Sequence, residues 1–326
     1  PMKLILGFGI PLLFGMLFQQ FYNMMDTIIV GKFLGVSALA SVGATGSINF
    51  MIIGFCMGVC NGFAIPVAQR FGAKDEHGMR KFVANSVWLS IIFAVVMAVL
   101  VCVFCRQILE LMNTPEDIID GSYSYIFVIF LGIPATYMYN LLSGIMRSLG
   151  DSKTPLYLLI FSSILNIILD LLSIIVLKMG VAGAAWATVI AQAVSGFCCL
   201  GVIWKKFPIL HVQREEWQPD KLCILNLCNM GIPMGLQYSI TAIGSVIIQA
   251  AVNSLGSVAV ASVAAAVKIN MFLCCPYDAM GSTMATYAGQ NVGAGKFDRL
   301  KQGEKILYAA GTCLWYCSFY IYSALR

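Results

Sequence analysis

Three carboxylates stand inside otherwise apolar stretches of this 326-residue chain: Asp26, Asp170 and Asp278. A carboxylate inside a membrane-spanning segment costs about 2.5–3.5 kcal/mol on insertion scales, so such residues are rare and mark functional sites by default. The other acidic residues fall in polar connectors or at segment ends. The three aspartates are therefore the first candidates for chemistry in this chain.

Two of these carboxylates share a depth with an amide and a hydroxyl. At 1.5 Å of rise per helical residue, Asp26 lies about 9 Å and Asp170 about 12 Å below the ends of their segments. Asn166 is one turn before Asp170 on the same helix face, and Thr188 lies about 15 Å into the following segment. Four oxygen-bearing side chains at one depth predict a cation site, with Asp26 and Asp170 as ligands of monovalent Na⁺, or a shared proton. The alternative is a set of separate interhelical hydrogen bonds, which polar residues in membrane bundles often form.

Further polar residues predict a hinge and a cavity. Pro11 lies in the middle of the first apolar segment, where proline removes a backbone hydrogen bond and kinks the helix, so the kink is either a hinge or static. Other polar side chains inside the segments either line a cavity or pack between helices: Gln19, Gln20, Asn23, Tyr137, Tyr139, Asn140 and Lys268.

The composition defines the elements that must position these residues. Hydrophobic residues make up 60% of the chain and charged residues 11%, and the mean hydropathy is +0.85. Soluble domains carry about 25% charged residues, so a water-soluble enzyme is excluded, and the chain is too apolar to be disordered. Runs of about 20 apolar residues have the length of transmembrane helices. We predict an all-α integral membrane protein with nine spanning segments, at about 4–30, 38–68, 82–105, 121–146, 155–177, 180–204, 222–252, 258–289 and 303–325.

The basic residues indicate sidedness. Fifteen of the 20 basic residues fall in one alternating set of connectors, including the one that contains Arg147 and Lys153. By the positive-inside rule, these connectors and the N-terminus are cytoplasmic in a bacterial plasma (inner) membrane. Because the basic residues lie in short loops between apolar runs, the net charge of +5 does not indicate a nucleic-acid partner. We expect the lipid bilayer and small molecules as partners, and a monomer.

An internal repeat predicts two lobes. Gly9–Pro11 recurs as Gly231–Pro233, and three later blocks recur in the same order, with an offset of 222 residues at the first match and 221 at the others. Six segments separate the copies, so the repeat is parallel, as in transporters that hold a substrate cavity between two halves. We predict a complete six-helix N-lobe at 1–205, a cytoplasmic inter-lobe linker at 206–221, and a partial C-lobe of about three helices at 222–326. A C-terminally truncated twelve-helix protein is expected.

The apolar segments contain no motif typical of an ATPase or a metal-dependent enzyme. The sequence has no G-x-x-x-x-G-K-[ST] loop for ATP and no H-E-x-x-H motif, and its D-x-x-D, Asp117–Asp120, lies in a polar connector. The 12 cysteines, Cys102-x-x-Cys105 among them, are interpreted as small apolar residues. We therefore expect neither an enzyme nor a cofactor besides the coupling ion. An intramembrane metal-dependent enzyme that uses Asp26 and Asp170 is the alternative from a different class, and a channel explains the repeat less well.

Four motifs resemble those of one transporter family. Arg147–Pro155 resembles the R-G-x-G-D-x-x-T-P signature of multidrug and toxic compound extrusion (MATE) transporters, with Ser148 where glycine is usual. Gln290–Gly295 resembles the family's Q-N-x-G-A motif. Asp26 and the residues after it resemble the first-helix aspartate motif, and Asn166–Asp170 resembles the fifth-helix N-x-x-x-D. The resemblance covers essentially the whole chain and is strongest to the DinF-like branch.

The resemblance implies a fold and a function. It implies a MATE-like two-lobe helical bundle with a V-shaped cavity, and an antiporter that exports drug-like, cationic or amphipathic compounds against an H⁺ or Na⁺ gradient. A lipid-linked oligosaccharide flippase of the same MOP flippase superfamily is the alternative within this fold.

The resemblance also implies residue roles. Asp26, Asn166, Asp170 and Thr188 match the family's cation-coupling site in the N-lobe, and Pro11 matches a proline that bends with protonation in some members. Thr241 stands where the NorM-like branch has a glutamate, which argues against a C-lobe Na⁺ site of that kind.

Overall fold

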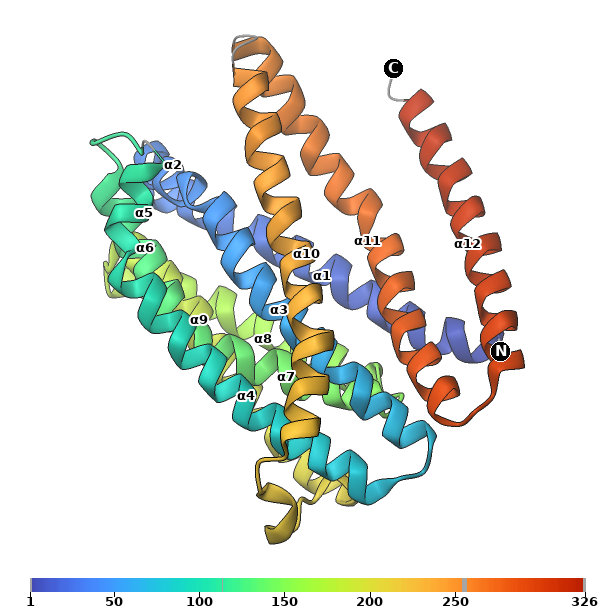
Figure 1. The fold of residues 1–326 in the computed structure, drawn as a ribbon. Helices are drawn as coiled ribbons and strands as arrows, with labels where there is room; N and C mark the ends of the chain where they lie inside the picture. Colours follow the sequence, from blue (N-terminus) through green and yellow to red (C-terminus); the bar gives the residue numbers. More distant parts are fainter. Residues whose placement is uncertain (1, 113, 254–256, 325–326) are drawn as a thin grey trace.

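The structure is a computed structural model that describes residues 2–112, 114–253 and 257–324, and all regular structure in these ranges is helical (Figure 1). Side chains are not described at 249–250, 253–262, 264–265, 268–269, 313 and 315–326. The helices are α1 (Met2–Leu34), α2 (Val36–Ala44), α3 (Gly46–Gly72), α4 (Glu76–Val103), α5 (Cys105–Leu111), α6 (Ile119–Leu131), α7 (Ile133–Ser148), α8 (Lys153–Leu171), α9 (Gly180–Lys206), α10 (Lys221–Asn253), α11 (Ser257–Gly293) and α12 (Phe297–Ala324). A π-helical turn (Leu172–Val176) extends α8, and short 3₁₀ turns (Pro208–Leu210 and Arg214–Trp217) lie between α9 and α10.

Helices occupy all nine predicted apolar segments, as far as the chain is described. By length and hydropathy, six helices of the described residues can cross a membrane: α1, α3, α4, α8 with its π-helical turn, α9 and α10. The bent pair α6–α7 makes a seventh. Helices α11 and α12 are long enough to span but are not in this set.

Two breaks between helices coincide with glycine. Gly35 separates α1 from α2 with φ of +86°, a conformation that side chains other than glycine rarely adopt. Gly132 separates α6 from α7, and Pro134 stands in the first turn of α7. The axis of the second helix is bent by 46° from that of the first. The bend sets the direction of α7, which carries polar residues predicted to line the cavity.

Helix α3 is the centre of the bundle. It packs against α4, α7, α10 and α11. Cys60 and Phe63 of α3 are fully buried, as is Met146 of α7. Outer helix α4 instead exposes large apolar side chains such as Ile91 and Val95. Apolar side chains on both faces are expected of helices that contact protein on one side and lipid on the other.

The connection between α7 and α8 is tied to α9. The Asp151 carboxylate accepts hydrogen bonds from the backbone N–H groups of Lys153 and Thr154 at 3.1 and 3.0 Å and caps α8. It also forms an ion pair with Lys206 at the end of α9, at 2.6 Å. Although burial opposes it, the bond from Lys206 holds the pKa of Asp151 below its usual range. The sequence motif Arg147–Pro155 thus has a structural use at this turn.

Segment 206–221, predicted as a linker, is held against α4. Glu216 is fully buried, and both of its carboxylate oxygens accept from Arg80 Nε at 2.9 Å. His77 Nδ1 lies 2.9 Å from the same carboxylate. Burial opposes ionisation, but the bonds from the Gln213 N–H and Arg80 hold the pKa of Glu216 below its usual range. This contact fixes where α10 begins relative to the first six-helix unit.

The second copy of the repeat packs on the first through glycines. A Cβ added at Gly62 of α3 would lie 2.5 Å from the Cα of Gly231 in α10, so only glycine allows this approach. The equivalent place in the other pair of helices is Gly9 of α1, where a Cβ would lie 3.0 Å from Thr283 Oγ1 of α11. The same repeat positions therefore meet twice, as expected of two halves related by an axis along the membrane normal.

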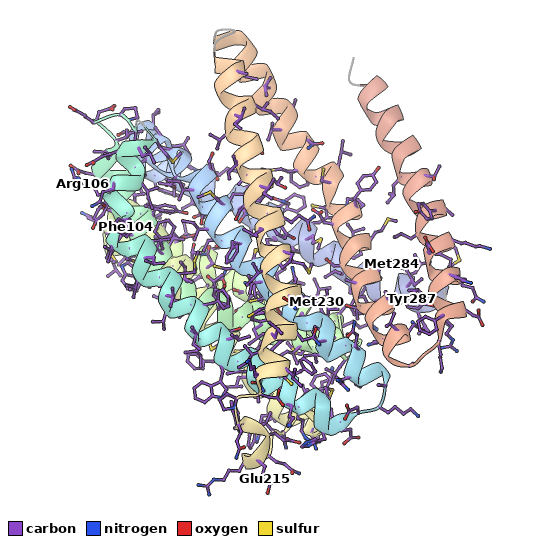
Figure 2. The ribbon with its side chains drawn as sticks, in the orientation of Figure 1. Phe104, Arg106, Glu215, Met230, Met284 and Tyr287 are labelled. Carbon is purple, nitrogen blue, oxygen red and sulfur yellow. The ribbon has the colours of Figure 1, made fainter. Side chains whose placement is uncertain are left out.

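The predicted two sides lie at opposite ends of the molecule. Arg106, from a connector outside the set predicted to be cytoplasmic, and Glu215, from segment 206–221, are at opposite ends in Figure 2. We call the end with the connections α3–α4, α7–α8, α9–α10 and α11–α12 the basic end. At that end α3 and α11 cross, and a Cβ at Gly72 or Gly293 would overlap the backbone of Gln290 or Gln69.

Candidate functional site

The predicted cation site brings together side chains from α1, α8 and α9. Asp170 and Asn166 are buried in the last two turns of α8, while Asp26 and Thr188 are partly buried. The carboxylates of Asp26 and Asp170 lie close enough to interact electrostatically. The π-helical turn begins two residues after Asp170, and such turns are frequent at functional sites.

Thr188 connects the helices of this cluster. Its Oγ1 accepts from Asn166 Nδ2 at 3.2 Å and lies 3.2 Å from Tyr22 Oη. It donates to the Ala184 carbonyl at 3.1 Å. One hydroxyl thus links α1, α8 and α9, and the cluster also contains the interhelical hydrogen bonds of the alternative interpretation.

Four buried oxygens of the cluster have no hydrogen-bond donor within the described part of the chain. They are Asp26 Oδ1, Asn166 Oδ1 and both carboxylate oxygens of Asp170. Buried polar atoms almost always have partners, so a group of buried acceptors without donors indicates a site for a positively charged partner. An all-oxygen set with two carboxylates fits a hard cation such as Na⁺, and it also fits protons on the carboxylates.

Sequence reasoning missed Tyr125 of α6. This side chain is buried and lies within electrostatic reach of Asp26, Asp170 and Tyr22. Its position depends on how α6 packs against α9 and on the bend after Leu131. A tyrosine in an apolar helix gives no sequence signal for this neighbourhood.

Some of the residues predicted to line a cavity do so. A cavity of about 110 Å³ lies between the two repeats, and Pro11, Gln19, Tyr139 and Asn140 are among the residues that line it. It adjoins a second cavity of about 290 Å³, and the two share Asn61, Arg147, Tyr238 and Ser282.

The other residues of that prediction lie elsewhere. Tyr137 is buried in the core rather than at the cavity, because it lies two residues, or about 200° of helix, from Tyr139. Gln20 lies beside Cys275 of α11, and Asn23 is exposed. The side chain of Lys268 lies outside the described residues. Thr241, which was not part of that prediction and stands where the NorM-like branch has a glutamate, is exposed and donates to the Gln237 carbonyl at 2.9 Å.

The structure corrects the predicted position of Arg147. We predicted this residue in a connector, which was wrong, because α7 continues to Ser148 and Arg147 lies within the helix. The side chain lines both cavities, and Arg147 Nη2 donates to Asn61 Oδ1 at 3.1 Å.

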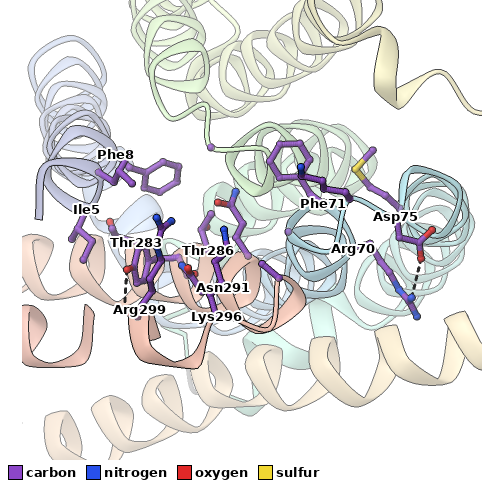
Figure 3. A pocket seen from close by; sticks show the side chains of 18 of the residues that line it. Ile5, Phe8, Arg70, Phe71, Asp75, Thr283, Thr286, Asn291, Lys296 and Arg299 are labelled. Carbon is purple, nitrogen blue, oxygen red and sulfur yellow. Dashed lines mark hydrogen bonds and ion pairs between the residues drawn. The ribbon is translucent and has the colours of Figure 1, made fainter. Parts of the chain in front are cut away.

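A third pocket, of about 550 Å³, lies at the basic end between α1, α3, α11 and α12. Figure 3 shows Arg70 and Asp75 joined by an ion pair on one side of it, and Lys296 and Arg299 on the other. No sequence prediction included this pocket. Its charges are of both signs, and the crossing of α3 and α11 forms part of its wall.

Apolar helices in two repeated copies, with a buried oxygen cluster and cavities between the copies, have the architecture of a secondary transporter. The chain belongs to the MATE family, whose MatE profile matches residues 11–172 and 233–321.

Relatives and solved structures agree with this family. The chain is 32% identical over 305 residues to the Bacillus subtilis protein named "Probable multidrug resistance protein YoeA", covering 90% of this chain and 65% of that one. It is 23% identical over 312 residues to the "FAD transporter" of Shewanella oneidensis, covering 92% and 67%. A solved outward-facing MATE transporter of the MOP superfamily has the same fold, with a TM-score of 0.90, 24% identity, and coverage of 96% of this chain and 69% of the other. The chain thus spans about two thirds of the length of these relatives.

Proposed function

We propose that this protein is a secondary active antiporter that exports small drug-like molecules in exchange for H⁺ or Na⁺. Family membership and the relatives named for multidrug resistance support export of small molecules. Because MATE family members are transporters, family membership favours transport over the alternative of an intramembrane enzyme. Within the described residues, no group of three or more His, Cys, Asp or Glu side chains could hold a metal ion.

One observation carries the proposed coupling role: the four buried acceptor oxygens of Asp26, Asn166 and Asp170 that lack a donor. A coupling ion must bind more tightly in one conformation than in the other, since only a differential affinity shifts the equilibrium. Asp26 and Asp170 come from different helices, so a relative movement of α1 and α8 changes their separation and with it the affinity for a shared cation. Pro11 supplies a place where α1 can bend.

Substitution by asparagine tests this role. Asp26→Asn and Asp170→Asn keep the side-chain size but remove the charge, and a neutral amide costs less to insert than a carboxylate. We expect both variants to insert normally and to lose gradient-driven transport of norfloxacin in everted membrane vesicles, measured with H⁺ and Na⁺ gradients in turn. Asp117→Asn is the matched control, because Asp117 is exposed in the α5–α6 connection.

The same assay contains the refuting result. Wild-type transport rates in Asp26→Asn or Asp170→Asn under either gradient would leave the cluster as interhelical hydrogen bonding only. Transport that depends on neither gradient in the wild type would refute the antiport itself.

A further inference from the structure

Arg147 is a cation inside the bundle whose donors are mostly unused. A guanidinium carries five N–H donors. In the part of the chain that the structure describes, the hydrogen bond of Arg147 is the one to the neutral Asn61 side chain, and it forms no ion pair. Desolvating a charge without a paired charge is costly, so this arrangement is retained only where something offsets it.

The cavity in front of Arg147 has walls from both repeats. Asn61 comes from α3, Arg147 from α7, Gln237 and Tyr238 from α10, and Asp278 from α11. The volume of about 290 Å³ is near the lower limit of small-molecule sites, and the adjoining cavity extends it. A few polar groups in an otherwise apolar wall are typical of sites that orient a ligand.

The cavity is lined by one negative and one positive side chain, Asp278 and Arg147. Asp278 is exposed and forms no ion pair with any described residue. Tyr238, which lines the same cavity, interacts electrostatically with both Asp278 and Arg147, so both charges lie near it. A molecule with one negative and one positive group can satisfy both, whereas a polyanion would be repelled by Asp278 and a simple cation by Arg147.

We infer that Arg147 binds the carboxylate of the transported molecule while Asp278 binds its protonated amine. The site therefore selects zwitterionic amphiphiles over compounds that carry only a positive charge. This inference rests on the proposed export function and specifies its substrate class. A planar guanidinium suits a carboxylate because two parallel N–H···O bonds form.

A pair of probes that differ only at the carboxylate tests the inference. Norfloxacin is a zwitterion at neutral pH, and its methyl ester keeps the amine but has no carboxylate. We expect the purified protein in detergent to bind norfloxacin more tightly than the ester in calorimetric titrations. Arg147→Gln should weaken norfloxacin binding about ten- to hundredfold and leave ester binding unchanged, since a charged hydrogen-bonded contact is lost.

Further variants separate recognition from folding. Arg147→Lys keeps the charge without the bidentate geometry, so norfloxacin binding should fall between wild type and Arg147→Gln. Asp278→Asn should weaken both probes about equally, because both carry the amine. Lys153→Gln, at an exposed cation near the same turn, is the matched control and should change neither.

Several results would overturn the inference. Equal losses for norfloxacin and its ester in Arg147→Gln would make Arg147 a structural partner of Asn61 alone. Equal affinity of the wild type for both probes, or no binding of either, would also refute a carboxylate subsite. Gradient-driven norfloxacin transport by the wild type, measured in vesicles under both gradients, keeps this outcome apart from a failure of the proposed antiport.

Discussion

The contact between α3 and α10 predicts opposite effects for the same substitution at two glycines. In Gly62→Ala, the new Cβ would lie 2.5 Å from Gly231 Cα and 2.6 Å from the Met230 carbonyl oxygen. Non-bonded carbon atoms pack at about 3.5–4.0 Å, so the helices must separate by roughly 1 Å. Both close atoms belong to backbone, so no side-chain rotation relieves the overlap.

The magnitude follows from two opposing effects. Overpacking costs about 1–3 kcal/mol, whereas alanine in a helix gains about 0.8–1.0 kcal/mol over glycine. Gly201 of α9 has nothing within 4 Å of the position that a Cβ would take, so Gly201→Ala has only the gain. The two variants should therefore differ in unfolding free energy by about 1–3 kcal/mol.

Thermal unfolding in detergent, followed with a thiol-reactive dye, measures this difference. We expect a lower midpoint for Gly62→Ala than for wild type and an equal or higher one for Gly201→Ala, with a gap of at least about 2 °C. Equal midpoints for the two variants would show that α3 and α10 are not in backbone contact, and the packing of the two repeats would need revision.

Three further predictions concern the basic end and the cation cluster. Because the folded-state pKa of Glu216 is lowered, its stabilisation of the fold is present above the usual pKa of 4.5 and is lost as the pH falls through the folded-state pKa. Glu216→Gln should therefore destabilise the protein at pH 7 and reduce its loss of stability on acidification. An unchanged acid profile in thermal scans would contradict this. A cysteine introduced at position 151 should react with a membrane-impermeant maleimide only after cells are opened, whereas one at position 117 should react in intact cells; the reverse pattern would invert the topology. Thr188→Val removes the hydrogen bonds to Tyr22 and Asn166 and should lower the unfolding free energy by about 1–2 kcal/mol. Thr27→Val removes an exposed hydroxyl that is bonded within its own helix, so it should leave the unfolding free energy unchanged. Equal melting points for the two variants would show that Thr188 does not connect α1, α8 and α9.

The depth of a side chain along its helix was predictable from the sequence, whereas the direction in which it projects from the helix axis was only partly predictable. The rise per residue is constant, so counting placed Asp26, Asn166, Asp170 and Thr188 in one layer before any packing was known. The face that each helix turns inward depends on its neighbours. Tyr137 and Tyr139 were predicted together for this reason, although only Tyr139 lines the cavity.

Helix ends were the other source of error. Arg147 was assigned to a connector because basic residues in membrane proteins usually mark loops. In the structure α7 continues through it, and the chain turns only after Ser148, where Gly150 has φ of +89° and Asp151 caps α8. A charge can thus remain inside the bundle when a cavity lies beside it.

The sequence by itself determined the membrane class, the helical segments, the internal repeat and the family. These follow from hydropathy, segment length and spaced motifs, which are properties of neighbouring residues along the chain. The tertiary structure decided that Tyr125 joins the cation cluster, that Gly62 meets Gly231, and that Arg147 shares a cavity with Asp278. The physical reason is that helices in lipid are apolar on every face, so no amphipathic stripe marks the side that packs, and only the close fit of the assembled helices selects it.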